Sequence, residues 1–196
     1  MERQGRHYVL RARATAVEQR RQRILAVAAD ALFTLPFDDL TLPLVAARAG
    51  VSTQTVRNHV ESKEGLLRAV GDYLSERQRT SREAAAGLDS AGVARMLVRE
   101  YETYGRAMTR LWAALERSPA LSELAQRGRR EHRAWLGTTF KDRLPTQARL
   151  REHRLAALYA ATDVGTWRLL RLDLGHSERM TTDVMRTLID GALTSS

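Results

Sequence analysis

Residues 42–61 read LPLVAARAGVSTQTVRNHVE, and this stretch decides the fold of the N-terminal part of the chain. Thr41, with Pro43 inside the first turn, predicts the start of a short helix, and Gly50 predicts its end because glycine tolerates a positive φ. Ser52 predicts the cap of a second helix that runs to about His59. Two short helices joined through Gly50-Val51-Ser52 predict a helix-turn-helix.

The second helix has two different faces. Val45, Val51 and Val56 supply apolar contacts between the two helices, and the small Ala46 lets them cross closely. The remaining faces carry polar side chains: Thr53, Gln54, Thr55, Asn58 and His59. A helix of about seven residues is roughly 10 Å long and fits a DNA major groove about 12 Å wide. The pattern therefore predicts a helix that reads DNA, although a structural bundle could carry the same small residues.

The rest of the chain has the same helical periodicity. Only four prolines and twelve glycines interrupt 196 residues, and apolar residues recur at spacings of three and four. We therefore expect an all-α protein of about nine helices, in which a three-helix helix-turn-helix domain precedes a helical bundle. The expected parts are a basic flexible arm (1–16), the helix-turn-helix domain (17–62), a connecting helix (63–86) and a ligand-binding and dimerisation domain (87–196).

Positive charge is concentrated at the N-terminus. Residues 1–23 carry seven arginines against Glu2 and Glu18, whereas residues 24–80 carry a net charge of −1, within a total of +9 for the chain. A basic arm of this kind can neutralise DNA phosphates or anionic lipid headgroups. Charge alone fits a solvated terminus equally well.

Several classes of protein are excluded by what the sequence lacks. The chain has no cysteine, so disulfides and thiol catalysis are excluded, and the composition fits a reducing cytoplasm. No stretch approaches 18 uninterrupted apolar residues, and the first fifteen residues do not resemble a signal peptide. Catalytic and nucleotide-binding motifs are absent, and the five histidines lie on different predicted elements without a partner at metal-binding spacing. We expect no enzyme, no cofactor and no metal site.

Three segments resemble the TetR (tetracycline repressor-like) family of bacterial transcription regulators: ILAVAADALF (24–33), FDDLTLPLVAARAGVSTQTV (37–56) and SKEGLL (62–67). The resemblance is strong over residues 17–75 and architectural beyond them. Two positions depart from it, because Arg57 stands where the family commonly has Tyr and Val60 where it has Phe. The run STQTVRNHV is also similar to a LuxR-type recognition helix, but that family has its reader at the C-terminus and lacks the SKEGLL continuation.

The resemblance implies a cytoplasmic, nucleoid-associated homodimer that binds a palindromic double-stranded DNA operator, and it favours a repressor over an activator. It implies that Thr41 and Lys63 hold phosphates and that Gln54, Thr55 and Asn58 face base edges. Further DNA contacts are expected from Ser52, Thr53, Arg57, His59, Arg20 and Arg21. The arm from Arg11 to Arg23 is expected in the adjacent minor groove.

Aromatic and methionine side chains cluster in the C-terminal half. The expected effector-binding residues are Tyr101, Tyr104, Met108, Trp112, His132, Trp135, Asp163 and Trp167. Large flat apolar walls with a few polar points suit a small apolar or aromatic molecule, although such a stripe can equally be packed core. The resemblance implies an inducer pocket here, in which binding lowers the affinity for the operator.

The last two predicted helices, 146–173 and 177–193, have wider apolar faces than one covering helix needs. The resemblance implies that they form a four-helix bundle with a partner subunit. The expected dimerisation residues are Leu155, Leu158, Tyr159, Met180, Val184 and Leu188. The alternative is that both helices close the core of the monomer.

A competing interpretation of the residues is a helical-bundle interaction protein whose basic arm binds acidic partners. Such a protein would show no preference for one DNA sequence over another, whereas a regulator would.

Overall fold

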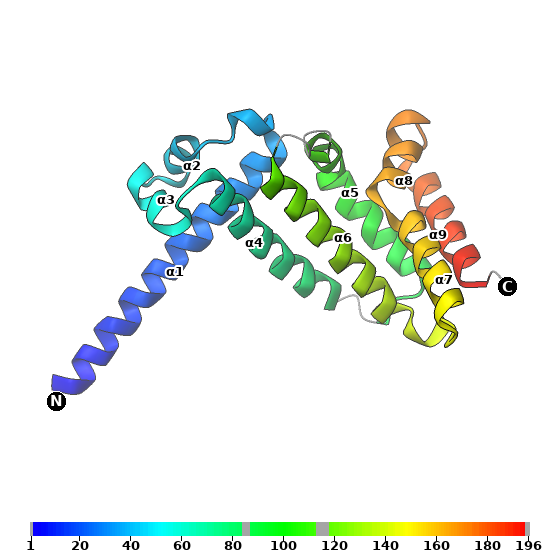
Figure 1. Ribbon diagram of the computed structural model, residues 1–196, viewed down its shortest axis with the longest axis horizontal. Helices are drawn as coiled ribbons and strands as arrows, with labels where there is room; N and C mark the ends of the chain where they lie inside the picture. Colours follow the sequence, from blue (N-terminus) through cyan, green and yellow to red (C-terminus); the bar gives the residue numbers. More distant parts are fainter. Residues whose placement is uncertain (1, 84–86, 113–117, 195–196) are drawn as a thin grey trace. The chain divides into compact units, whose positions relative to one another are not determined.

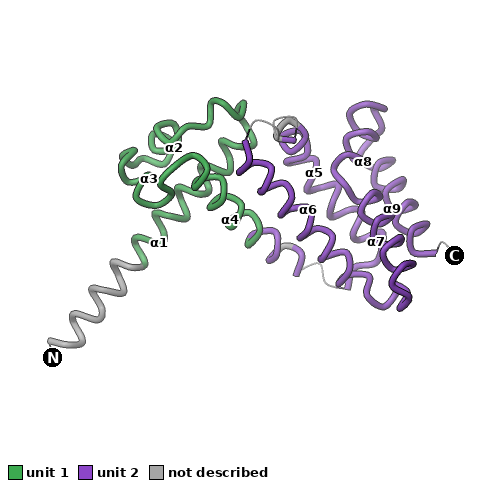
Figure 2. Tube along the Cα trace, viewed as in Figure 1, with its two compact units in different colours: residues 1–76 green, residues 77–196 purple. Residues whose placement is uncertain are grey.

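The computed structural model describes residues 2–83, 87–112 and 118–194, and the side chains of residues 2–14, 81, 110 and 111 lie outside that description. Every regular element in the described segments is helical, which confirms the all-α prediction. Contacts divide the chain into two compact units, residues 1–76 and residues 77–196 (Figure 2). None of the described helices is long and apolar enough to span a bilayer.

The first unit is built on the long helix α1 (Glu2–Thr34). A short 3-10 turn (Phe37–Asp39) leads to α2 (Leu42–Ala49), α3 (Thr53–Val60) and the first part of α4 (Lys63–Glu83), and α2 packs against both α1 and α3 (Figure 1). The core gathers apolar side chains from all four helices, and each of the following is at most 5% exposed: Ile24, Leu25, Ala28, Leu32, Val45, Ala46, Val56, Val60, Leu66, Leu67 and Val70.

Local hydrogen bonds begin and end these helices where the sequence predicts them. The Thr41 hydroxyl accepts from the Leu44 N–H at 3.3 Å, and Ser52 Oγ accepts from the Thr55 N–H at 3.1 Å. Gly50 ends α2 in the left-handed conformation with φ 64°. Ser62 Oγ accepts from the Gly65 N–H at 3.1 Å in the first turn of α4. These contacts confirm the predicted caps of the helix-turn-helix.

The second unit contains the end of α4, then α5 (Ser90–Trp112), α6 (Pro119–Thr139), a 3-10 turn (Lys141–Arg143) and α7 (Ala148–Thr162). It closes with α8 (Val164–Arg168), a π-helical turn (Leu169–Asp173) and α9 (Glu178–Thr194). Helix α9 packs against both α5 and α7 (Figure 1). The core of this unit includes Leu97, Leu136, Leu158, Trp167 and Met185, each at most 1% exposed.

Two predicted helix boundaries in this unit are wrong. The sequence predicts separate helices over about 91–104 and 105–117, but α5 is continuous through Gly105. The Trp167 ring lies directly on α5 at this glycine: a Cβ there would stand 2.4 Å from Cζ3 of that ring. The helix expected over 146–173 is divided at Asp163, whose extended backbone starts α8 while its carboxylate accepts from the Gly165 N–H at 2.8 Å.

The predicted parts of the chain also differ from the two units. Helix α1 begins at Glu2, so residues expected as a flexible arm continue the first helix, since no proline precedes Pro36. The division between units falls inside α4, after residue 76, rather than at its ends. Residue 1, residues 84–86 of the predicted connecting helix and residues 113–117 of the predicted bundle lie outside the described residues.

Candidate functional site

Helix α3 presents a polar surface over an apolar base. Val56 is fully buried and Val60 is 5% exposed, which fixes the helix on its neighbours. Gln54, Arg57 and Asn58 are exposed, whereas Thr53, Thr55 and His59 are half-buried. Gln54 Nε2 donates to Asn58 Oδ1 at 2.9 Å, and the Ser52 and Thr55 hydroxyls lie 2.8 Å apart. The outward face is therefore a set of hydrogen-bonding groups held in register before any ligand arrives.

The bond between Gln54 and Asn58 leaves specific groups available. It uses one N–H of the Gln54 amide and the carbonyl oxygen of the Asn58 amide. The Gln54 carbonyl oxygen and the Asn58 NH₂ take no part in it. An acceptor and a donor on neighbouring turns of one helix match the donor and acceptor pattern that an adenine edge presents in the major groove.

The two residues expected to hold DNA phosphates, Thr41 and Lys63, come before and after α3 in the sequence and have different environments. Thr41 is exposed at the start of α2, where its hydroxyl already accepts a backbone hydrogen bond. Lys63 is half-buried: its Nζ donates to the Phe37 carbonyl at 2.8 Å and lies 4.1 Å from the centre of the Phe37 ring. Lys63 is thus tied to its own chain, a contact that the sequence did not predict.

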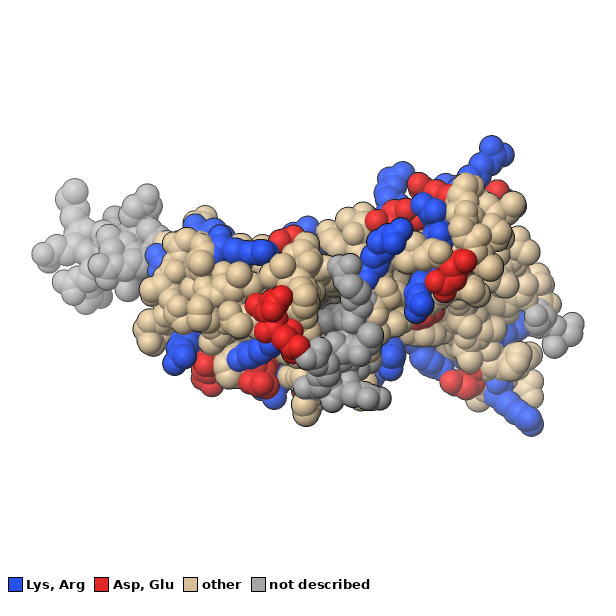
Figure 3. Space-filling view, turned by 90° about the horizontal axis from the view of Figure 1, so that it is seen from above, with Lys and Arg blue, Asp and Glu red and all other residues tan. Residues whose placement is uncertain are grey.

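The two arginines expected to contact DNA from α1 lie in the middle of that helix. Arg20 is exposed, and Arg21 is half-buried with its guanidinium 3.7 Å from the Glu18 carboxylate. The arm residues Arg11 and Arg13 have side chains outside the described residues. On the face drawn in Figure 3, blue Lys and Arg side chains alternate with red Asp and Glu across both units.

Among the residues expected to bind the effector, two pairs of rings are in contact, and the others lie outside these pairs. Tyr101 and Trp167 are buried with ring centres 6.1 Å apart, and His132 lies 5.6 Å from Trp135. Tyr104 is 45% exposed and is not brought into the cluster. Met108 and Trp112 are half-buried against the core, and Asp163 is half-buried at the start of α8.

A chain of hydrogen bonds runs through this cluster and sets the protonation state of His132. The Arg82 guanidinium, which can only donate, lies 3.0 Å from Nδ1 of His132. Nδ1 therefore accepts, and the ring proton sits on Nε2, which donates to Thr162 Oγ1 at 2.8 Å. The Thr162 hydroxyl in turn donates to the Leu158 carbonyl at 2.7 Å, and the Tyr101 hydroxyl donates to the Thr162 carbonyl at 2.8 Å.

The electrostatics of the cluster agree with this arrangement. Burial, together with the positive charge of Arg82, lowers the pKa of His132 to about 3. Burial raises the pKa of Tyr101, and burial with the nearby Asp163 carboxylate raises the pKa of Tyr159 to about 12. His132 is therefore neutral, and both tyrosines keep their hydroxyl protons at neutral pH. The sequence did not predict Arg82, Thr162 or Tyr159 as members of this cluster.

Comparison with known proteins identifies the family to which the fold and the first unit belong. Residues 24–70 match the model of bacterial regulatory proteins of the tetR family, which spans the helix-turn-helix described above. The chain is a TetR-family transcriptional regulator.

Relatives along the whole chain agree with this family assignment. The regulator is 25% identical over 190 residues to the HTH-type transcriptional regulator BetI of Cronobacter sakazakii, covering 88% of this chain and 92% of that protein. It is similar to a solved member of the TetR family from Streptomyces coelicolor A3, with a TM-score of 0.63, 25% identity and coverage of 87% and 98%. A transcriptional regulator from Rhodococcus sp. Rha1 has the same fold, with a TM-score of 0.68, 19% identity and coverage of 88% and 95%.

The TetR family assignment decides between the alternatives that the sequence left open. The similarity of α3 to a LuxR-type reader is only local. A TetR-family regulator binds DNA, which also excludes an adaptor that has no role in transcription. Members of the family are transcription factors rather than enzymes, and they bind DNA operators and small-molecule effectors as dimers.

In this TetR-family regulator, the residues expected at the dimer interface lie in two different environments. Leu155 and Leu158 are 7% and 0% exposed and belong to the core of their own chain, in which α7 packs against α6 and α9. Met180 and Leu188 on α9 are 50% and 44% exposed, and Val184 and Tyr159 are half-buried. The exposed part of the expected face therefore lies mainly on α9.

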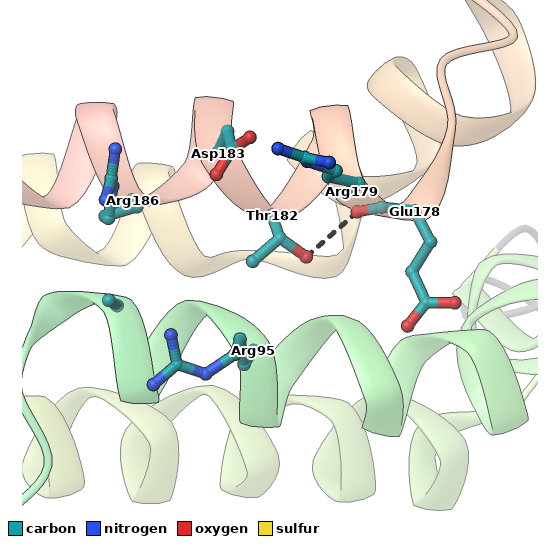
Figure 4. Close-up of a pocket in the computed structure, with 7 residues that line it drawn as sticks. Arg95, Glu178, Arg179, Thr182, Asp183 and Arg186 are labelled. Atoms are coloured by element: carbon teal, nitrogen blue, oxygen red, sulfur yellow. Dashed lines mark hydrogen bonds between the residues drawn. The ribbon is translucent and has the colours of Figure 1, made fainter.

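A shallow hollow of about 470 Å³ lies on another side of α9, where α9 meets α5. Figure 4 shows side chains from both helices around it, with Arg95 on α5 and Arg179 and Arg186 on α9. Glu178 and Asp183 line the same hollow, so charges of both signs face its opening.

Proposed function

We propose that this regulator is a homodimeric repressor that binds a palindromic operator and releases it when a small apolar or aromatic effector binds. The observation that carries the proposal is the polar outer face of α3 over the buried Val56 and Val60. A helix anchored by apolar side chains and exposed on its hydrogen-bonding side is what reading of the major groove requires.

Base reading falls to Gln54, Thr55 and Asn58. The hydrogen bond between the Gln54 and Asn58 amides supports this role, because a preorganised pair loses little rotamer freedom when it binds a base. Thr55 offers a methyl group to thymine and a hydroxyl that already meets Ser52.

Positioning on the DNA backbone falls to the remaining polar residues. Thr41, Ser52 and Thr53 lie at the start of helices α2 and α3, where backbone N–H groups attract phosphate. Lys63 contributes mainly through its charge, because its amine is bound to the Phe37 carbonyl. The other expected phosphate ligands are Arg57, His59, Arg20 and Arg21.

Dimerisation uses the exposed side of α9 and the adjoining surface of α7. Met180, Val184 and Leu188 recur every four residues and form one stripe. On α7, Ala156 and Ala160 are exposed, and such small side chains allow a partner helix to approach closely. Leu155 and Leu158 support this surface from the monomer core, and Tyr159 flanks it.

The effector site comprises the aromatic cluster of the second unit. Tyr101, His132, Trp135 and Trp167 supply flat walls, with Met108, Trp112 and Asp163 around them, and the exposed Tyr104 lies outside the cluster. Helix α4 belongs to both units, so an effector that shifts its C-terminal end is able to alter the DNA-binding unit.

Selection of duplexes from a random pool tests the proposal. The expected result is a palindrome whose half-sites are centred about one helical turn, or a multiple of it, apart. A single unpaired half-site would contradict the dimer while leaving DNA reading intact. Enrichment of no sequence at all would contradict sequence-specific regulation.

A further inference from the structure

Arg82, at the C-terminal end of α4, is a half-buried cation without a carboxylate partner. Its guanidinium lies 4.8 Å from the centre of the Trp135 ring and donates to the neutral His132. Its Nε is buried and has no hydrogen-bond partner. Across residues 2–83, 87–112 and 118–194, no carboxylate forms an ion pair with it. A partly desolvated charge in this state is costly unless something else supplies the missing negative group.

The nearest carboxylates are already engaged elsewhere. Glu100 accepts a hydrogen bond of 3.0 Å from Gln78, and Glu131 accepts one of 2.9 Å from Arg127. Both raise the pKa of Arg82 through space, but burial lowers it more, so the net shift is downward. Neither carboxylate replaces a direct partner for the guanidinium.

The groups around Arg82 suit an aromatic molecule. Trp135 stacks on the guanidinium, and His132 lies between Trp135 and Tyr159. The rings of His132 and Tyr159 meet edge to face, with their centres 5.3 Å apart. Arg82 itself is only half-buried, so part of it can be reached from solvent. The cluster thus combines flat apolar surfaces with one accessible positive charge.

We propose that Arg82 binds the acidic group of the effector, and that the effector is therefore an aromatic or apolar carboxylic acid. This inference rests on the proposed function, because it names the chemical class that the same site accepts. The carboxylate would accept from the guanidinium N–H groups in the forked geometry that arginine favours.

A cationic effector fits this site less well. The positive charge of Arg82 already contributes to the low pKa of His132, which shows that a second positive charge is disfavoured at this place. A cation would have to displace Arg82 from both His132 and Trp135 before it could use the rings.

Matched acids and amides test the proposal. The probes are 1-naphthoate with 1-naphthamide, phenylacetate with phenylacetamide, and benzyltrimethylammonium as the cation. Calorimetry on the full chain would give affinities, and release of the selected operator would be followed on the same samples. We expect each acid to bind about tenfold or more tightly than its amide, since a charged hydrogen-bonded pair is worth at least that factor.

The variant Arg82→Gln keeps a donor for Nδ1 of His132 but removes the charge. It should abolish the preference for acids over amides. The control Arg95→Gln, which removes an exposed arginine in the hollow beside α9, should retain that preference. An unchanged preference in Arg82→Gln, equal binding of amides or the cation, or no binding of either acid at about 1 mM would each overturn the inference.

A second measurement uses the unmodified chain, in case Arg82→Gln does not fold. Nitrogen-15 NMR at neutral pH would follow the ring nitrogens of His132 with saturating 1-naphthoate and, as the matched control, with 1-naphthamide. Because the Arg82 guanidinium donates to Nδ1 of His132, a carboxylate that binds Arg82 should move the Nδ1 resonance more than the amide does, and equal shifts with both probes would contradict the inference. A chain that binds its operator but releases it only to neutral molecules keeps the proposed function. A chain that binds the acids through Arg82 but selects no DNA sequence loses it.

Discussion

The carbonyl oxygen of Val60 occupies the place where a side chain on Gly65 would begin: a Cβ on Gly65 would stand 2.0 Å from that oxygen. The last residue of the recognition helix α3 and the first turn of α4 are therefore in backbone contact. This contact explains why glycine stands inside the run SKEGLL.

The substitution Gly65→Ala should destabilise the regulator by about 2 kcal/mol or more, because a backbone oxygen cannot move aside as a flexible side chain can. Thermal unfolding would measure the loss. Gly128→Ala is the matched control: this glycine lies in α6 with nothing within 4 Å of an added Cβ, so alanine should stabilise by about 0.5–1 kcal/mol. Equal effects of the two substitutions would contradict the contact.

Glu61 joins α3 to α4 in a strained conformation. Its φ of 60° and ψ of −53° form a γ-turn in which the Ser62 N–H donates to the Val60 carbonyl at 2.6 Å. Glycine adopts this conformation without strain, so Glu61→Gly should stabilise the chain by about 1 kcal/mol despite the added freedom of the unfolded state. Glu61→Ala should give no such gain in the free energy of unfolding measured with denaturant. If alanine stabilised the chain as much as glycine does, the cause would be the loss of the Glu61 charge and not the relief of backbone strain.

Charge on the exposed stripe of α9 should prevent dimerisation. Replacing Met180 and Leu188 together with glutamate would place four like charges in a symmetric interface, and sedimentation should then show monomers. Arg186→Glu changes another exposed residue of α9, beside the hollow, and should leave the dimer intact. A dimeric double variant would place the interface elsewhere.

His132 should make the stability of the second unit depend on acid. Burial and the charge of Arg82 lower the pKa of His132 from the ordinary 6.5 to about 3 in the folded chain. Between these two pH values the histidine is protonated in the unfolded chain but not in the folded chain. Stability from this group is complete above about pH 6.5 and falls as the pH drops toward 3, by about 2 kcal/mol between pH 7.5 and 5. Urea unfolding of the wild type and of His132→Gln at both pH values measures it. Identical pH dependence in the two proteins would contradict the buried neutral histidine.

Much of the first unit could be predicted from sequence because its signals are local. Thr41, Ser52 and Ser62 cap helices through hydrogen bonds to residues three positions away, and Gly50 ends α2 through its own φ. Such contacts depend on neighbours in the sequence and need no knowledge of the tertiary fold.

The second unit was predicted less completely because its decisive contacts are distant in sequence. The Trp167 ring lies on α5 at Gly105, which is 62 positions away in the sequence, and no local pattern carries that information. Arg82 was missed although a signal existed: it continues the four-residue row of Val70, Leu74 and Gln78, which turns inward along α4. A charged residue on an inward row indicated a buried cation, and only the fold identified His132 and Trp135 as its neighbours.

The ratio of the affinity for the operator to the affinity for random DNA, measured for variants of α3, tests whether this helix reads the bases. Affinity for the selected operator and for a random duplex of equal length would be measured at one salt concentration for the wild type, the double variant Gln54→Ala/Asn58→Ala and the control Arg95→Gln. We expect the double variant to lose about tenfold or more of its preference for the operator, while its affinity for the random duplex stays the same. An unchanged preference in the double variant would contradict reading of DNA by α3.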